Sequence, residues 1–195
     1  MRLFIALDID DAIRERIIGF VAALSCLAPD ARWARPESLH VTLKFIGEQS
    51  EAAVERIKNA LATIPASPVD VHFRGYGFFP TATSARVFWI GLQAGPELAA
   101  LAEAIDEKTA SLGIPKEDRA FSPHLTLARG RGGSGSPRRN QTDGPNRTFQ
   151  RLQEKLAPLT APEFGTMTAR KFFLYQSHLS PKGSKYTKLA AFDLK

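Results

Sequence analysis

Two of the four histidines in this 195-residue sequence begin the same tetrapeptide, His-x-Thr-Leu, at His40 and at His124. Two such matches among four histidines should arise by chance only on the order of a few times in ten thousand. A histidine can accept or donate a proton near neutral pH, because its unperturbed pKa is about 6.5. Two histidines on opposite sides of a phosphorus atom could deprotonate the attacking oxygen and protonate the leaving oxygen. The repeated tetrapeptide therefore predicts one site that acts on a phosphodiester.

The spacing inside each tetrapeptide predicts which side chains share a face. Residues i and i+2 of a strand point to the same side, so His40 and Thr42 would face one way while their apolar neighbours enter a core. The same holds for His124 and Thr126. If the two halves of the chain pack around a pseudo-twofold axis, both faces can meet across one cleft. The threonine hydroxyls could then donate hydrogen bonds to the non-bridging phosphate oxygens, where charge accumulates.

Two other interpretations of a histidine compete with catalysis. One is a histidine that only satisfies its hydrogen bonds on a half-exposed strand, and this suits His72 and His178, which lack the tetrapeptide. The other is a metal ligand. Catalytic zinc usually takes three protein ligands, and neither tetrapeptide supplies a Cys, Asp or Glu on the histidine face. We therefore expect no metal in the site.

Apolar periodicity and turn residues predict the elements that position the motifs. Strands are expected at residues 2–8, 39–46, 69–79, 86–92, 124–128, 166–175 and 186–194. Helices are expected at about residues 10–27, 50–64, 96–112 and 149–156. This order mixes hairpins with helices and divides into two similar halves, which predicts an α+β fold. We expect residues 1–195 to form a single domain.

The composition favours a phosphate-bearing partner and disfavours a membrane. Lys and Arg number 26 against 20 Asp and Glu, which gives a formal charge of +6. Residues 130–147 are rich in Gly, Ser, Arg and Pro and predict a mobile basic surface loop. The single cysteine, Cys26, excludes an internal disulfide and fits the reducing cytoplasm. No apolar run approaches the roughly 20 residues that span a bilayer.

The residues around the two motifs resemble the two-histidine phosphoesterase superfamily. Within it, the chain is most similar to the prokaryotic RNA 2′,3′-cyclic phosphodiesterases, also called 2′-5′ RNA ligases. The resemblance covers nearly the whole chain. It is carried by residues 2–7, 39–47 and 123–129, and near the end by Ser177, Leu179, Gly183, Tyr186, Leu189 and Phe192.

This resemblance implies two lobes of antiparallel sheet and helices around a central cleft, without a cofactor. It also implies that His40 is the proton donor and His124 the proton acceptor, an order that two nearly identical motifs cannot give by themselves. A substrate contact is implied for Arg129 as well, and a guanidinium suits a phosphate. Strict alternation from His124, however, places Arg129 on the opposite face, so a bulge or the strand end would have to turn it into the cleft.

We therefore expect a cytoplasmic, monomeric enzyme that opens the 2′,3′-cyclic phosphate at an RNA end to a 2′-phosphate. The reverse reaction would join a 5′-hydroxyl end in a 2′-5′ linkage. Two alternatives stay open: a phosphodiesterase for small cyclic nucleotide phosphates, and an RNA-binding module without catalysis.

Overall fold

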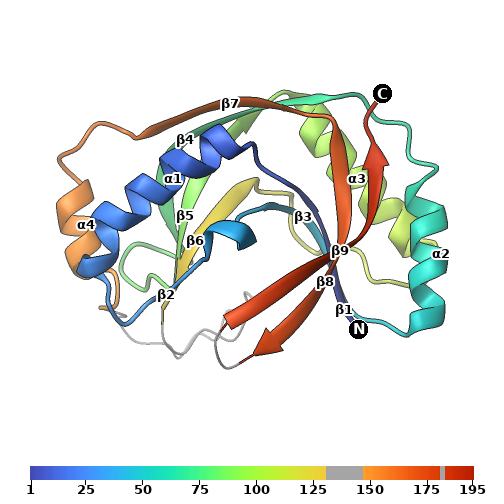
Figure 1. Ribbon diagram of the computed structural model, residues 1–195, viewed down its shortest axis with the longest axis horizontal. Helices are drawn as coiled ribbons and strands as arrows, with labels where there is room; N and C mark the ends of the chain where they lie inside the picture. Colours follow the sequence, from blue (N-terminus) through green and yellow to red (C-terminus); the bar gives the residue numbers. More distant parts are fainter. Residues whose placement is uncertain (131–146, 181–182) are drawn as a thin grey trace.

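A computed structural model describes residues 1–130, 147–180 and 183–195 (Figure 1). The loop predicted at residues 130–147 lies, apart from its two end residues, outside this part of the chain. The described residues form an α+β fold, which confirms the predicted class. The strands are β1 (Arg2–Leu7), β2 (Arg32–Trp33), β3 (Val41–Glu48), β4 (Val69–Phe79), β5 (Val87–Ala94), β6 (His124–Arg129), β7 (Glu163–Ala169), β8 (Lys171–Ser180) and β9 (Gly183–Asp193). The helices are α1 (Asp11–Leu24), α2 (Glu51–Leu61), α3 (Pro96–Ala110) and α4 (Gln150–Leu156), with short 3-10 turns η1 (Ser25–Leu27) and η2 (Pro36–Ser38).

The strands form two antiparallel sheets, each at the centre of one lobe. The first sheet has the order β3-β1-β8-β9 and the second the order β2-β6-β5-β4-β7. In Figure 1 helices α2 and α3 flank the first sheet, and helices α1 and α4 lie beside the second. None of the described helices is long and apolar enough to cross a membrane.

The lobes do not coincide with the two halves of the sequence. Helix α1 follows β1 of the first sheet but packs against β7 of the second. Helix α3 follows β5 of the second sheet but packs against β3 of the first, next to α2. The sequence pattern correctly indicated two similar halves, but it could not show that they are interleaved.

The strand predicted at residues 166–175 is wrong as a single element. Its first part belongs to β7 in the second sheet and its last part to β8 in the first sheet, with Arg170 between them. Apolar residues continue through the junction, because Met167, Phe172 and Leu174 all enter the core. The hydrophobic pattern therefore runs on although the chain passes from one lobe to the other.

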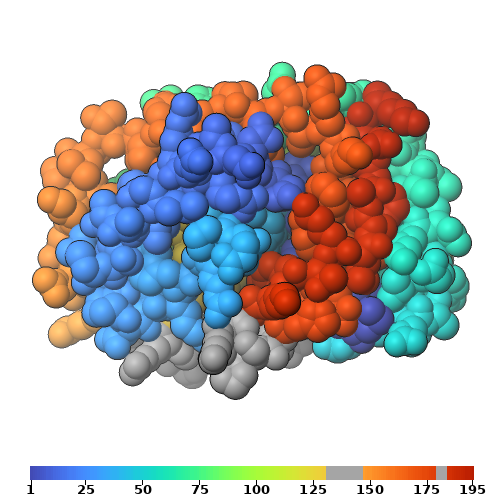
Figure 2. Space-filling view, in the orientation of Figure 1, coloured from blue at the N-terminus to red at the C-terminus, as the bar shows by residue number. Residues whose placement is uncertain are grey.

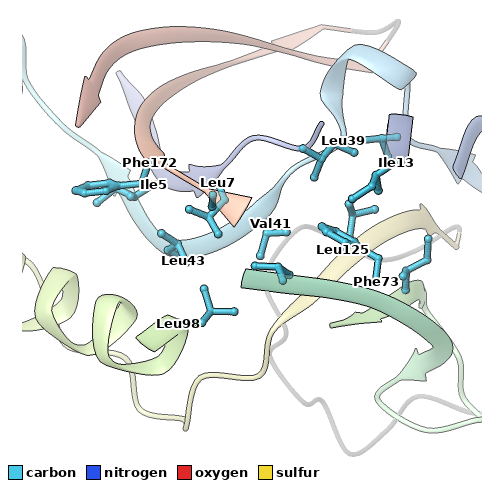
Figure 3. Close-up of a cluster of buried hydrophobic side chains, with 14 of the residues drawn as sticks. Ile5, Leu7, Ile13, Leu39, Val41, Leu43, Phe73, Leu98, Leu125 and Phe172 are labelled. Atoms are coloured by element: carbon cyan, nitrogen blue, oxygen red, sulfur yellow. The ribbon is translucent and has the colours of Figure 1, made fainter. Parts of the chain in front are cut away.

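One continuous core joins the two lobes beneath the motifs. Figure 3 shows Val41 of β3 near Leu125 of β6, with Leu43 and Leu98 close by. Val41 and Leu125 are fully buried, and burying a side chain of this size contributes about 1.5–3 kcal/mol. The apolar faces of the two motif strands thus hold β3 and β6 together, which leaves their other faces toward the space between the sheets.

A charged side chain is buried beneath the first motif. Lys44 is only 2% exposed, and its ammonium donates hydrogen bonds to the Asp106 carboxylate of α3 and to the Pro115 carbonyl at 2.9 Å. The same Asp106 oxygen accepts a hydrogen bond from the Glu117 amide at 3.2 Å. Removing Asp106 would leave the buried Lys44 ammonium without its counter-charge, which is unfavourable. This pair ties α3, and the segment that leads toward His124, to the strand that follows His40.

Candidate active site

Both motifs adopt the alternation that their spacing predicts. His40 lies directly before β3 and Thr42 within it, while His124 and Thr126 lie on β6. All four side chains are partly exposed. The residues between and after them are at most 5% exposed: Val41, Leu43, Leu125 and Leu127. Each motif therefore has one face in the core and one polar face toward the other lobe.

A bulge lies at the last residue of each motif. Leu43 has no partner where β3 pairs with β1, and Leu127 has none where β6 pairs with β5. A bulge shifts the alternation by one residue, so the side chain five positions after each histidine returns to the histidine face. That residue is Phe45 in the first copy and Arg129 in the second. The structure thus places Arg129 on the same face as His124, through the bulge that this position requires.

The His40 ring is held by one hydrogen bond and by aromatic side chains. Its Nδ1 lies 2.6 Å from the Ser38 carbonyl oxygen. The ring centroids of Phe4 and Tyr186 lie 4.8 and 5.1 Å away, and that of Tyr175 lies at 6.3 Å. These aromatic residues come from β1, β8 and β9, so the first sheet supplies the aromatic side chains around this imidazole.

Burial lowers the pKa of His40 from 6.5 to about 4. The positive charges of Arg129 and His124 lower it further, whereas the Ser38 carbonyl and the Asp8 carboxylate favour the protonated ring. An electrostatic effect of both Arg129 and His124 on His40 requires that these groups lie close together. Val41 and Leu125 share the core beneath the two motifs, so the polar faces of β3 and β6 lie next to each other.

The second imidazole has a parallel environment. His124 Nδ1 lies 2.8 Å from the Ser122 carbonyl oxygen, and the rings of Phe79 and Trp89 lie 5.1 and 6.2 Å from it. Burial and, in second place, the nearby Arg129 charge lower the pKa of His124, although the Ser122 carbonyl opposes them. This lowering is smaller than the one at His40.

The two serine carbonyls fix the tautomer of both rings. A carbonyl oxygen only accepts hydrogen bonds, so the Nδ1 of His40 and of His124 must carry the hydrogen. Each neutral ring then has its lone pair on Nε2, which can take up and release a proton. The repeat in the sequence is in fact longer than the tetrapeptide, because Ser38 and Ser122 both stand two residues before the histidine. That serine repeat was visible in the sequence and could have pointed to these supports.

A pocket of about 660 Å³ adjoins His40 on the first lobe. The Asp8 carboxylate lies in it, accepting hydrogen bonds from Arg14 at 2.9 Å and from Lys188 at 2.6 Å. Arg14 also donates to the Pro36 carbonyl at 2.5 Å and so holds η2, which carries the carbonyl that orients His40. In Figure 2 the light-blue surface of this segment lies between the blue of α1 and the red of the β8–β9 hairpin. Nothing in the sequence marked Asp8, Arg14 or Lys188 as neighbours of the site.

The other two histidines lie outside the cleft. His72 Nε2 on β4 is within hydrogen-bond distance of the Glu163 carboxylate at 2.7 Å, and His178 on β8 is exposed. Within the described part of the chain, no three His, Cys, Asp or Glu side chains gather closely enough to hold a metal ion.

The fold and this paired-histidine cleft define a phosphoesterase of the LigT-like family, to which the chain belongs. The model of that family, described as LigT like Phosphoesterase, matches residues 7–89 and 90–186, and each stretch contains one motif. This confirms the family resemblance seen in the sequence.

Relatives with a named activity match over the full length. The RNA 2′,3′-cyclic phosphodiesterase of Archaeoglobus fulgidus is 36% identical over 99% of this chain and 100% of its own. The protein of the same name from Methanothermobacter thermautotrophicus is 29% identical over 100% and 99%. Among solved structures, E. coli LigT in complex with 3′-AMP matches with a TM-score of 0.76, at 25% identity over 99% of this chain and 97% of that one.

Proposed function

We propose that this enzyme opens the 2′,3′-cyclic phosphate at an RNA end and leaves a 2′-phosphate. The observation that carries the proposal is the pair of imidazoles, each held through Nδ1 by a serine carbonyl, on two strands that share one core, with Arg129 on the same face as His124. Relatives named RNA 2′,3′-cyclic phosphodiesterase support the choice of substrate. The basic charge of +6 agrees with an RNA partner.

In the proposed reaction, water attacks phosphorus and the bond from phosphorus to the ribose 3′ oxygen breaks. His124 Nε2 accepts the proton of the attacking water, and His40 Nε2 gives its proton to the departing 3′ oxygen. His124 gains one proton and His40 loses one, so after a single turnover the proton of the pair is on His124 instead of His40. Arg129, Thr42 and Thr126 donate hydrogen bonds to the non-bridging oxygens as negative charge grows there.

The two imidazoles differ in acidity. Burial depresses the pKa of His40 more than that of His124, which makes His40 the stronger acid and His124 the stronger base. The family resemblance assigns the same order. A bound phosphodiester carries a negative charge, which favours the protonated form of both rings and offsets the depression in the free protein.

No step of this scheme needs a metal ion, and the reaction can also run backward. A 5′-hydroxyl in place of water would form a 2′-5′ linkage, but water is far more concentrated, so hydrolysis dominates. The lone cysteine, which is exposed, fits a reducing compartment, and we place a monomeric enzyme in the cytoplasm.

The test uses an oligoribonucleotide with a 2′,3′-cyclic phosphate end, incubated with the protein in EDTA. We expect a 2′-phosphate product, identified against synthetic 2′- and 3′-phosphate standards. His40→Ala and His124→Ala should each lower turnover by about 2 orders of magnitude or more while the protein stays folded. His72→Ala and His178→Ala are matched controls that should stay near wild type.

Three outcomes would contradict the proposal. Activity that is lost in EDTA and restored by zinc or manganese would show a metal-dependent mechanism. RNA binding without any product would show a non-catalytic binding module. Equal losses at all four histidines would show that the motif histidines act only through folding.

A further inference from the structure

Three arginines lie together at one end of the cleft. Arg129 is the last residue of β6, and Arg32, the first residue of β2, is its cross-strand partner, so both side chains leave the same face of the second sheet. Arg2 is the first residue of β1 and alternates with the buried Leu3 and Ile5, which places it on the cleft face of the first sheet. The two lobes thus contribute to one basic cluster: Arg2, Arg32 and Arg129.

The charges of this cluster are not neutralised by described residues. None of the three arginines forms an ion pair or hydrogen bond with another residue in the described part of the chain. Glu48, the cross-strand neighbour of Arg2, pairs instead with the N-terminal ammonium at 3.3 Å. Burial lowers the pKa of Arg129, Tyr186 raises it, and the positive charges of Arg32 and Arg2 lower it further. Arg32, opposite Arg129 in the sheet, and Arg2 both act on the charge of Arg129.

We propose that Arg2 and Arg32 bind the phosphodiester on the 5′ side of the terminal nucleotide, one nucleotide away from the phosphate that reacts. This inference rests on the proposed function and makes it more specific: the substrate is an oligonucleotide or a 5′-phosphorylated nucleotide, not a bare nucleoside cyclic phosphate.

The positions of the three arginines indicate which phosphate each of them binds. Arg129 acts electrostatically on both imidazoles, so its guanidinium belongs to the phosphate between them. Arg32 lies on β2, the edge strand of the second sheet, and Arg2 lies two residues before Phe4, whose ring contacts His40, so both lie outside the pair of imidazoles. A cluster of like charges is unfavourable until an anion binds, and arginine is suited to holding phosphate through two parallel hydrogen bonds. The next phosphate along an RNA chain is such an anion.

The experiment compares three substrates that differ only on the 5′ side. They are cytidine 2′,3′-cyclic phosphate, the same compound with a 5′-phosphate, and a dinucleotide with the same cyclic end. Wild type should open the second and third with a kcat/KM roughly tenfold or more above the first, as a charge-assisted contact predicts. The double variant Arg2→Met/Arg32→Met should lose this advantage, so that all three compounds are opened with similar efficiency. Arg2→Lys/Arg32→Lys should restore part of it.

Arg56→Met, which removes an exposed positive charge from α2, is the control for general attraction and should keep the full advantage. Equilibrium binding of the three corresponding 2′-phosphate products gives a readout that does not depend on turnover. The wild-type affinity should rise with the 5′-phosphate, and in the double variant it should not. Equal efficiency of the three substrates in wild type, or an equal loss on all three in the double variant, would overturn the inference. If wild type opened none of the three substrates, the proposed function would be rejected instead. The binding of the three 2′-phosphate products would then still test whether Arg2 and Arg32 bind the 5′ phosphate.

Discussion

The kcat/KM of this enzyme should be highest below pH 6.5. The pH dependence of kcat/KM reports ionisations of the free enzyme. The pKa of His40 is about 4 and that of His124 lies below 6.5. Catalysis needs one protonated and one neutral imidazole, so the active fraction follows a bell that is centred between the two pKa values. That centre lies in the acidic range, well below the centre for two unperturbed histidines.

The size of the effect follows from the depressed pKa of His40. A group with a pKa of about 4 is protonated in roughly one molecule in a thousand at pH 7. Once the pH exceeds both pKa values, kcat/KM should fall about tenfold for each further pH unit. In the complex the phosphodiester charge favours both protonated rings, so the optimum of kcat should lie closer to neutrality.

The assay measures initial rates on a cyclic-phosphate oligoribonucleotide from pH 4 to 9, at constant ionic strength, far below and far above KM. A kcat/KM that stays level from pH 5 to 8, or that rises across this range, would refute the two-histidine reasoning. A kcat optimum more acidic than that of kcat/KM would also refute it, because the bound anion would then have acted with the wrong sign.

Three further results are expected. Thr42→Val and Thr126→Val should each lower kcat by an amount equivalent to about 1–3 kcal/mol with little change in KM, since the hydroxyl acts in the transition state; a rise in KM alone would contradict this. Arg129→Met should move both limbs of the kcat/KM profile to higher pH, because the Arg129 charge lowers the pKa of both imidazoles; an unmoved profile would argue against that contact. The folded pKa of His40, about 4, lies below its unfolded value, so the unfolded chain binds the proton more tightly and the free energy of unfolding falls as the pH drops from 6.5 toward 4. His40→Gln should remove up to about 3 kcal/mol of this fall in the free energy of unfolding. Urea unfolding of wild type and variant at pH 7 and 4.5 measures it. An equal fall in both proteins would show that another group causes it.

Local patterns predicted the parts of the molecule that depend on neighbours in sequence. The period of two in each motif is enough to separate His40 and Thr42 from their buried neighbours, because side chains alternate along any strand. Ser50 accepts a hydrogen bond from the Ala53 amide as the N-cap of α2, as its type and place predict. Gly113 after α3 has a φ of 86°, a conformation that glycine adopts at little cost.

Features set by pairing between distant strands were beyond the sequence pattern. The bulges at Leu43 and Leu127 depend on which residues of β1 and β5 lie opposite, so the face of Arg129 stayed undecided until the register was known. The aromatic wall of His40 includes Tyr186, a residue of β9 whose proximity follows only from the order of strands in the first sheet. The proposed roles of the five predicted site residues are still to be tested by the variants described above.

The interleaving of the two lobes affects how the chain folds during synthesis and which truncations it can tolerate. Strand β1 pairs on one side with β3 and on the other with β8. The second edge of β1, where Arg2 lies opposite Ser177, can therefore close only after β8 has been synthesised. A nascent chain that already contains both catalytic motifs still exposes the unpaired edge of β1, the kind of edge on which other strands can add. A product that ends before β8 would thus contain His40 and His124 yet lack both the closed sheet and the ring of Tyr186 beside the first imidazole. Two fragments produced by dividing the chain between its motifs should not fold independently. Helix α1 of the first fragment packs on β7 of the second, and helix α3 of the second packs on β3 of the first.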